Sequence, residues 1–145
     1  MNYQYPEDGL LQAHRVVQDE EIRNPQHLGV NGEKCLLVVK NGSTTGTTIG
    51  RTNGLDSFTC TLPKCGIKHI FLSLAVLPYK TRSKFSDFGD SGSIVLTRDG
   101  CIVGLLTGGT GPSDETDITL ITPFWWLEKE IKAKFPGSFL YPVAK

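Results

Sequence analysis

The sequence predicts an all-β domain that ends in one helix. Its 145 residues are enough for a single domain with a stable core. From Val30 onward, short apolar runs alternate with turn residues, and Asn-Gly or Asp-Gly pairs recur between them. Such pairs favour tight chain reversals because both residues tolerate positive φ. Six or seven short strands at this spacing are typical of a barrel or a sandwich.

The strand candidates follow one another along the chain with turn residues between them. They are rich in β-branched and apolar residues, which suit a half-buried pleated surface. Asn41-Gly42 is expected to close the first hairpin, and Arg98-Asp99-Gly100 a later one. The predicted strands are Glu33–Lys40, Thr45–Thr52, Ser57–Leu62, Lys68–Leu77, Ser93–Thr97, Cys101–Thr107 and Asp117–Ile121.

Two segments have helical rather than strand periodicity. Near the N-terminus, Gly9–Glu21 is expected to form a helix that Asn24-Pro25 closes. At the C-terminus, Thr122 is expected to cap a helix whose first position is Pro123. Pro136-Gly137 ends it. Its apolar stripe consists of Phe124, Leu127, Ile131 and Phe135.

Composition and charge limit the classes of partner. Fifteen Lys and Arg balance fifteen Asp and Glu, and no basic cluster is present, so nucleic acid and membranes are not expected partners. No apolar run is long enough to span a bilayer. The start, Met1–Asp8, lacks the basic flank and apolar stretch of a signal peptide. With Met1 as the native start, this predicts a cytoplasmic protein.

The first 30 residues are polar and poorly periodic, which predicts a partly irregular N-terminal extension (1–30) before the barrel domain (31–145). Of the four cysteines, Cys60 and Cys65 alone are close in sequence, and Cys35 and Cys101 stand apart. The cysteines are either buried free thiols in a reduced compartment or include one Cys60–Cys65 bridge. No spacing of zinc ligands occurs, and no cofactor is predicted.

One loop carries recognisable chemistry. Gly89 and Gly92 flank Asp90-Ser91, and an apolar strand follows. Glycines on both sides allow a tight turn and leave successive amides unobstructed, so that several N–H groups can point at one oxyanion. The serine hydroxyl beside that spot is a candidate nucleophile. The elbow of α/β-hydrolases is excluded, because its motif needs glycine where Ser93 stands.

Gly89–Ser93 resembles the nucleophile segment of trypsin-like serine peptidases. Two further segments occur in the same order as in that family. Lys40–Gly46 resembles the "K-x-G-x-T-T-G" strand of bacterial-type members, and Gly104–Gly111 resembles the "G-x-x-S/T-G-G-x-G" strand beside the specificity pocket. The resemblance implies a single Greek-key barrel like the C-terminal half of these peptidases. Three segments are also similar in sequence to trypsin-like proteins of mushroom-forming fungi, namely Lys40–Arg51, Leu77–Tyr79 and Leu105–Gly109.

The resemblance implies a role for each matching residue. Ser91 is the implied nucleophile, and the amides of Gly89 and Ser91, with Asp90 between them, are the implied oxyanion hole. The implied substrate-binding residues, which would pair with a substrate backbone and shape the side-chain pocket, are Thr107, Gly108 and Gly109.

The general base is the missing part. In this family the histidine and its aspartate come from a first barrel, and too few residues precede the second barrel here to form one. The nearest match to the family's "T-A-A-H-C" motif is Ala13-His14, which makes His14 the candidate base. His27 is expected to lie in a loop. His69 is expected to lie in an apolar strand and to have a structural role there. A serine without a base is a poor nucleophile, so the chain alone is predicted to be inactive.

Three functions remain open. The first is a half-domain that acts by binding protein or peptide. The second is a serine endopeptidase fragment or subunit, completed by a partner that supplies His and Asp. The third is a small fungal bioactive or defence protein. The barrel face left without its first barrel is expected to be apolar and to need cover, from residues 1–30, a separate partner or a second copy, with a homodimer preferred.

Overall fold

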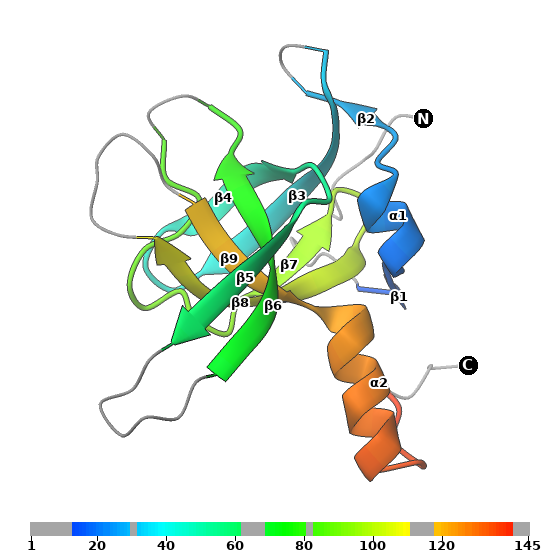
Figure 1. Ribbon diagram of the computed structural model, residues 1–145. Coiled ribbons are helices and arrows are strands. Elements are labelled where there is room, and N and C mark those ends of the chain that lie inside the picture. The colour runs from blue at the N-terminus through cyan, green and yellow to red at the C-terminus, as the bar shows by residue number, and fades with distance from the viewer. Residues whose placement is uncertain (1–12, 30–31, 62–68, 81–82, 111–117, 141–145) are drawn as a thin grey trace, which may run out of the picture.

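The computed structural model describes residues 13–29, 32–61, 69–80, 83–110 and 118–140. Within these residues, six strands close an antiparallel barrel (Figure 1). Around the barrel they are β3 (Lys34–Gly42), β4 (Gly46–Thr52), β6 (His69–Pro78), β9 (Ile118–Pro123), β8 (Cys101–Thr110) and β7 (Ile94–Thr97), which pairs back to β3. The β6-to-β7 connection joins strands that are not neighbours, as in a Greek key. The predicted all-β Greek-key barrel with a C-terminal helix is confirmed.

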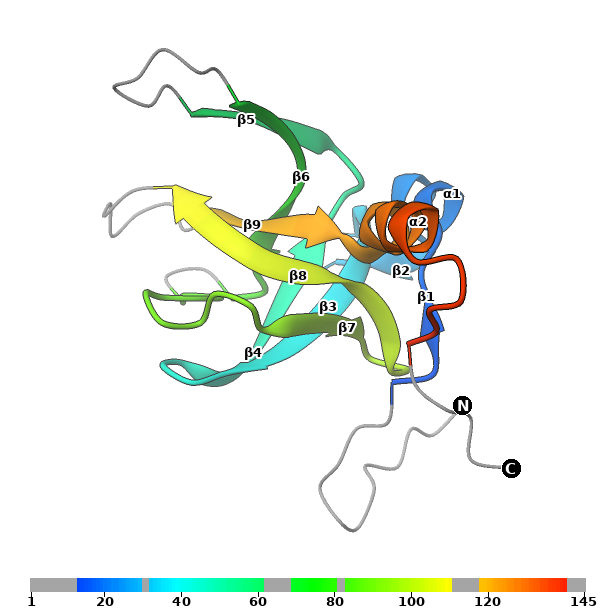
Figure 2. The same cartoon turned by 90° about the horizontal axis from the view of Figure 1, so that it is seen from below.

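One hairpin extends beyond the barrel. β6 pairs with β5 (Asp56–Thr61) through His69–Leu74, and its remaining residues pair with β9 and β4. The β5–β6 hairpin therefore projects from the barrel wall (Figure 2).

Alternating residues of the strands fill the barrel. Along β3, Leu36, Val38 and Lys40 are buried, whereas Leu37 and Val39 are only half-buried. This is the period of two expected of a strand with one face inward. The core also contains Leu74, Val76, Phe85, Val95, Val103, Leu106 and Ile121.

The C-terminal helix begins one residue later than the sequence predicts. α2 spans Phe124–Lys134, and its N-cap position is Pro123. Thr122 does not cap the helix, because it belongs to β9 and pairs with Leu105 in the ladder. α2 packs against β8 and β9, where Trp125 contacts the core.

The first hairpin also turns later than expected. Asn41 and Gly42 continue β3 and pair with Thr47 and Gly46. The turn itself is Ser43–Thr45. Asn41-Gly42 does not form the turn, because the amides of Thr44 and Thr45 in the observed turn donate hydrogen bonds to Asp90.

The helix predicted over Gly9–Glu21 is wrong within the described residues. Arg15–Val16 form strand β1, which pairs in parallel with β8. α1 spans only Asp19–Arg23, because a capping box between Gln18 and Glu21 starts it there. β2 (His27–Leu28) then pairs with β3. Val17 and Ile22 are buried in the barrel core, so residues 13–29 join the same sheet and the same core as the barrel.

Two of the four cysteines are described as side chains. Cys35 and Cys101 are buried free thiols. The Cys60–Cys65 alternative lies outside the described side chains. No helix among the described residues is both long and apolar enough to cross a membrane.

Candidate functional site

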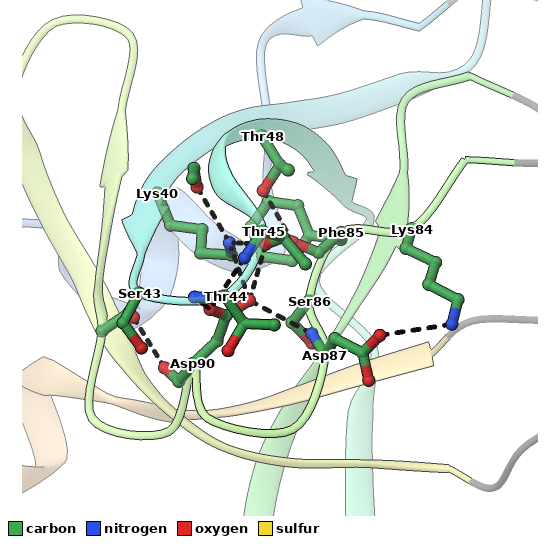
Figure 3. A network of polar contacts seen from close by, with 12 residues as sticks. Lys40, Ser43, Thr44, Thr45, Thr48, Lys84, Phe85, Ser86, Asp87 and Asp90 are labelled. Atoms are coloured by element: carbon green, nitrogen blue, oxygen red, sulfur yellow. Dashed lines mark hydrogen bonds and ion pairs between the residues drawn. The ribbon is translucent and has the colours of Figure 1, made fainter.

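A buried ion pair joins the Ser91 loop to the first hairpin. The Lys40 ammonium on the inner face of β3 lies 3.1 Å from Asp90 Oδ2, and both side chains are fully buried. Figure 3 shows the surrounding contacts. Lys40 also donates hydrogen bonds to the Thr45 hydroxyl and to the Gly46 carbonyl, 3.1 Å away. Its Nζ lies 5.8 Å from the centroid of the Phe85 ring, within cation–π range.

Hydrogen-bond donors surround the Asp90 carboxylate. Oδ1 accepts from the amides of Thr44 (2.8 Å) and Thr45 (3.2 Å). Oδ2 accepts from the Thr45 hydroxyl (2.6 Å) and the Asp87 amide (3.1 Å). Burial would raise the pKa of Asp90, but the bonds from Thr45, Thr44, Lys40 and Asp87 outweigh it and hold this pKa well below its usual range.

Two glycines make this close approach sterically feasible. A Cβ at Gly42 would lie 2.3 Å from Asp90 Oδ1. A glycine two residues after Lys40 is therefore required for the carboxylate to reach the hairpin. Gly89 has φ +99°, and a Cβ there would lie 2.4 Å from Thr44 Oγ1. A side chain at either position would separate the loop from the hairpin.

The hairpin tip also fixes two carbonyls of the loop. Ser43 Oγ donates to the Gly89 carbonyl (2.8 Å), and Thr44 Oγ1 donates to the Phe88 carbonyl (2.7 Å). The C=O and N–H of one trans peptide unit point in opposite directions. Holding the Phe88 carbonyl towards the hairpin therefore turns the Gly89 N–H away from it.

Some backbone amides of the loop donate hydrogen bonds within the protein, and others, which we call open, do not. The amides of Asp90, Gly92 and Ser93 donate to Asp87, Leu106 and Asp90 carbonyls respectively. Within the described residues, the amides of Gly89 and Ser91 donate no hydrogen bond. Ser91 itself lies exposed in a turn. The loop thus presents two open N–H groups, one on each side of Asp90, next to an exposed hydroxyl.

An open strand edge begins beside this loop. β7 pairs with β8 as far as Leu105, and Leu106 then bonds to Ser93 and Gly92. Beyond Leu106, none of the described strands pairs with the edge of β8 opposite β9. The residues along it are those that the family resemblance implies for substrate binding, Thr107, Gly108 and Gly109.

The glycines leave space along the edge. A Cβ at Gly108 would meet nothing within 4 Å, and one at Gly109 would meet only the Ile118 carbonyl oxygen at 3.4 Å. Thr107 occupies the bulge of β8, where its hydroxyl donates to the Leu120 carbonyl (3.3 Å).

The structure does not bring His14 to Ser91. The His14 amide donates to the Gly100 carbonyl, and its Nε2 lies 3.8 Å from Cys101 Sγ. Cys101 begins β8, whereas the Ser91 loop bonds to Leu106. Five strand residues separate these points by about 16 Å, at roughly 3.3 Å per residue.

The other two histidines belong to different parts of the fold. His27 lies in β2 rather than in the predicted loop, and its Nδ1 accepts a hydrogen bond from the Leu37 amide (3.4 Å). His69 begins β6 in the projecting hairpin, and its side chain lies outside the described residues. No group of three or more His, Cys, Asp or Glu side chains able to hold a metal occurs among the described residues.

Lys40 is the residue whose role sequence reasoning missed. It was recognised only as part of a motif, with no function of its own. A signal was present: Leu36, Val38 and Lys40 alternate along an apolar strand, which places a lysine on the inner face. A buried lysine needs a buried acid, and Asp90 is that acid.

Comparisons with known proteins find similar solved structures. No family model matches the chain, and no curated protein matches its sequence. Among solved structures, the chymotrypsin of Cellulomonas bogoriensis is similar, with 20% sequence identity and a TM-score of 0.47. The similarity covers 86% of this chain and 52% of that one. The chain therefore spans about half the length of that protein.

Asp90→Asn is expected to lower the free energy of unfolding by about 3–5 kcal/mol, because it leaves the Lys40 charge buried without a counter-ion. The double variant Lys40→Met/Asp90→Asn is expected to recover part of this loss. Urea denaturation measures both. Asp99→Asn, which removes the exposed Arg98–Asp99 pair, is the control and should change little. An Asp90→Asn protein as stable as the wild type would contradict the assigned ion pair.

Proposed function

We propose that this chain is a trypsin-like peptidase half-domain that binds extended polypeptide segments and does not hydrolyse them alone. One observation carries the proposal. The braced Ser91 loop keeps two open amides beside an open strand edge, while neither His14 nor His27 lies at that loop. The described residues of the site suit the binding of a backbone, and no described histidine side chain lies where it could activate the hydroxyl.

The bound segment adds a strand to the barrel. Its backbone pairs with the free edge of β8 at Thr107–Gly109, as extended peptides do at other exposed sheet edges. One of its oxygens accepts hydrogen bonds from the Gly89 and Ser91 amides. Without a base to take its proton, the Ser91 hydroxyl stays a neutral alcohol and no acyl intermediate forms.

Reduced, denatured, fluorescein-labelled casein tests both parts of this function. We expect its fluorescence anisotropy to rise with added protein, while gel electrophoresis shows the casein intact. Gly109→Val fills the space beside the edge and is expected to weaken binding at least tenfold. The control is Gly137→Val, because Gly137 also has open space for a Cβ but lies beyond α2. Equal binding by both variants would move the site away from β8.

A second candidate function is a serine endopeptidase completed by a partner that supplies His and Asp. The exposed Ser91 hydroxyl and the two open amides support it, since a nucleophile and oxyanion donors are two of the groups that acyl transfer requires. Casein cleavage that Ser91→Ala abolishes, or reaction of Ser91 with a peptidyl phosphonate, would support this second function over binding alone.

The partner surface that we propose is the outer face of β3, β4 and β7. Cross-strand pairing places Leu96, Val39 and Ile49 in one row. Ile94, which is 47% exposed, lies next to this row on β7, and Ile49 is 56% exposed. We call these four residues the apolar strip. Among the described helices, α2 packs against β8 and β9, and α1 lies beside β1 and β2 (Figure 2).

A second copy of the chain suits the apolar strip. The strip carries no charge, and the nearby Arg51 is already paired with Glu33. The whole chain has a formal net charge of zero, so two copies experience little repulsion. A two-fold dimer would bury the strip of each copy against the other.

Light scattering over a wide concentration range is expected to give the mass of a dimer. Ile49→Lys places a charge in the strip and should yield a monomer that remains folded, because the side chain is already exposed. Leu28→Lys is the control, since Leu28 is 64% exposed and lies on β2, outside the strip. A wild-type monomer at all concentrations, or a dimer that persists in Ile49→Lys, would exclude this interface.

A further inference from the structure

We propose that the polypeptide segment bound by this chain is a C-terminus, held by its free α-carboxylate at the amides of Gly89 and Ser91. The inference rests on the proposed peptide-binding function and specifies its ligand. It follows from the direction of the free edge, from the unused donors at its end and from the charges around them.

The direction of the added strand places its C-terminal end at the loop. Both barrel neighbours of β8 are antiparallel to it. A segment that extends the line of β7 along the free edge would also be antiparallel, and would run from Gly109 towards Thr107. Gly92 and Ser93 bond to Leu106 at the end of that path. The added strand therefore ends where the Ser91 loop begins.

The donors at that point suit an anion. Gly89 (φ +99°) and Gly92 (φ +85°) give the loop a backbone that L-residues rarely adopt. Turns of this kind gather successive N–H groups into concave sites that bind anions, carboxylates of chain termini among them. Hydrogen bonds to a carboxylate are roughly twice as strong as bonds to a neutral carbonyl. The two open amides therefore favour a chain terminus over an internal peptide bond.

The charges of the loop do not oppose a carboxylate. The Asp90 charge is directed into the barrel, where Lys40 compensates it. Asp87 pairs with Lys84 at 3.3 Å. Both acidic side chains of the loop thus have a cationic partner. Binding a terminus also requires no proton transfer, which agrees with a site in which neither His14 nor His27 lies beside Ser91.

The test uses N-terminally fluorescein-labelled hexapeptide pools of degenerate sequence. Each pool has one fixed last residue and is prepared with a free C-terminal carboxylate and, separately, as a C-terminal amide. Fluorescence anisotropy measures both. We expect at least one carboxylate pool to bind, and its amide to bind at least tenfold more weakly. Equal binding of the two forms would overturn the carboxylate inference while leaving peptide binding intact. Binding of neither form would reject the proposed function itself.

Thr44→Val tests the assigned contact within the loop. Its hydroxyl holds the Phe88 carbonyl and so directs the Gly89 N–H outward. The substitution is expected to bring the affinity for the carboxylate pool close to that for the amide pool. Thr47→Val is the matched control, because Thr47 is an exposed threonine of the same hairpin and no described hydrogen bond involves its side chain. A Thr44→Val protein that still prefers the carboxylate pool tenfold would contradict the assignment of the Gly89 amide.

Discussion

The Lys40–Asp90 ion pair is the interaction on which the site depends. Burying an isolated charge costs several kcal/mol, so each of these side chains requires the other. Asp90 lies between the two open amides, and Lys40 lies on the inner face of β3. Satisfying the pair therefore fixes the position of the Ser91 loop against the first hairpin. The same constraint explains why Gly42 lacks a side chain and why the hairpin turns at Ser43–Thr45, where its amides reach Asp90.

Most of the fold follows from local signals in the sequence. Strand runs, most glycine turns and the existence of α2 depend on nearest neighbours, so periodicity and turn chemistry locate them. The packed side of α2 was predicted wrongly, because Trp125 contacts the core whereas Ile131 and Phe135 of the predicted stripe are exposed. The features that the sequence did not predict depend on contacts between segments that are distant along the chain. The Asn41-Gly42 signal lost to the bond between the Thr44 amide and the Asp90 carboxylate, which are 46 residues apart in sequence. Arg15–Val16 form a strand only because β8 offers an edge, and a two-residue strand has no period to detect. The motif indicated where the site lies, but it did not indicate the role of Lys40.

In the proposed function, binding and chemistry are separable. One barrel supplies all the groups that would hold a peptide backbone, and contacts inside the barrel hold them in position. These groups are the edge of β8 and the amides of Gly89 and Ser91. His14 does not supply the group that would activate Ser91, because it lies beside Cys101, at the opposite end of β8 from the Ser91 loop. We propose that recognition of a peptide backbone is what this chain itself contributes. Under this proposal, hydrolysis would require a partner that supplies the base.

The protonation of Asp90 tests this account most directly. A lowered pKa means that the folded state binds its proton less readily than the unfolded chain does. The ionised carboxylate therefore stabilises the fold above the unfolded pKa of about 3.9, and this contribution is lost as the pH falls. A ¹³C NMR titration of the aspartate carboxyl carbons, assigned with Asp90→Asn, is expected to show Asp90 still ionised at a pH below the unfolded value of about 3.9. An Asp90 that titrates at the unfolded value of about 3.9 would contradict the buried, fully bonded pair and the braced loop built on it.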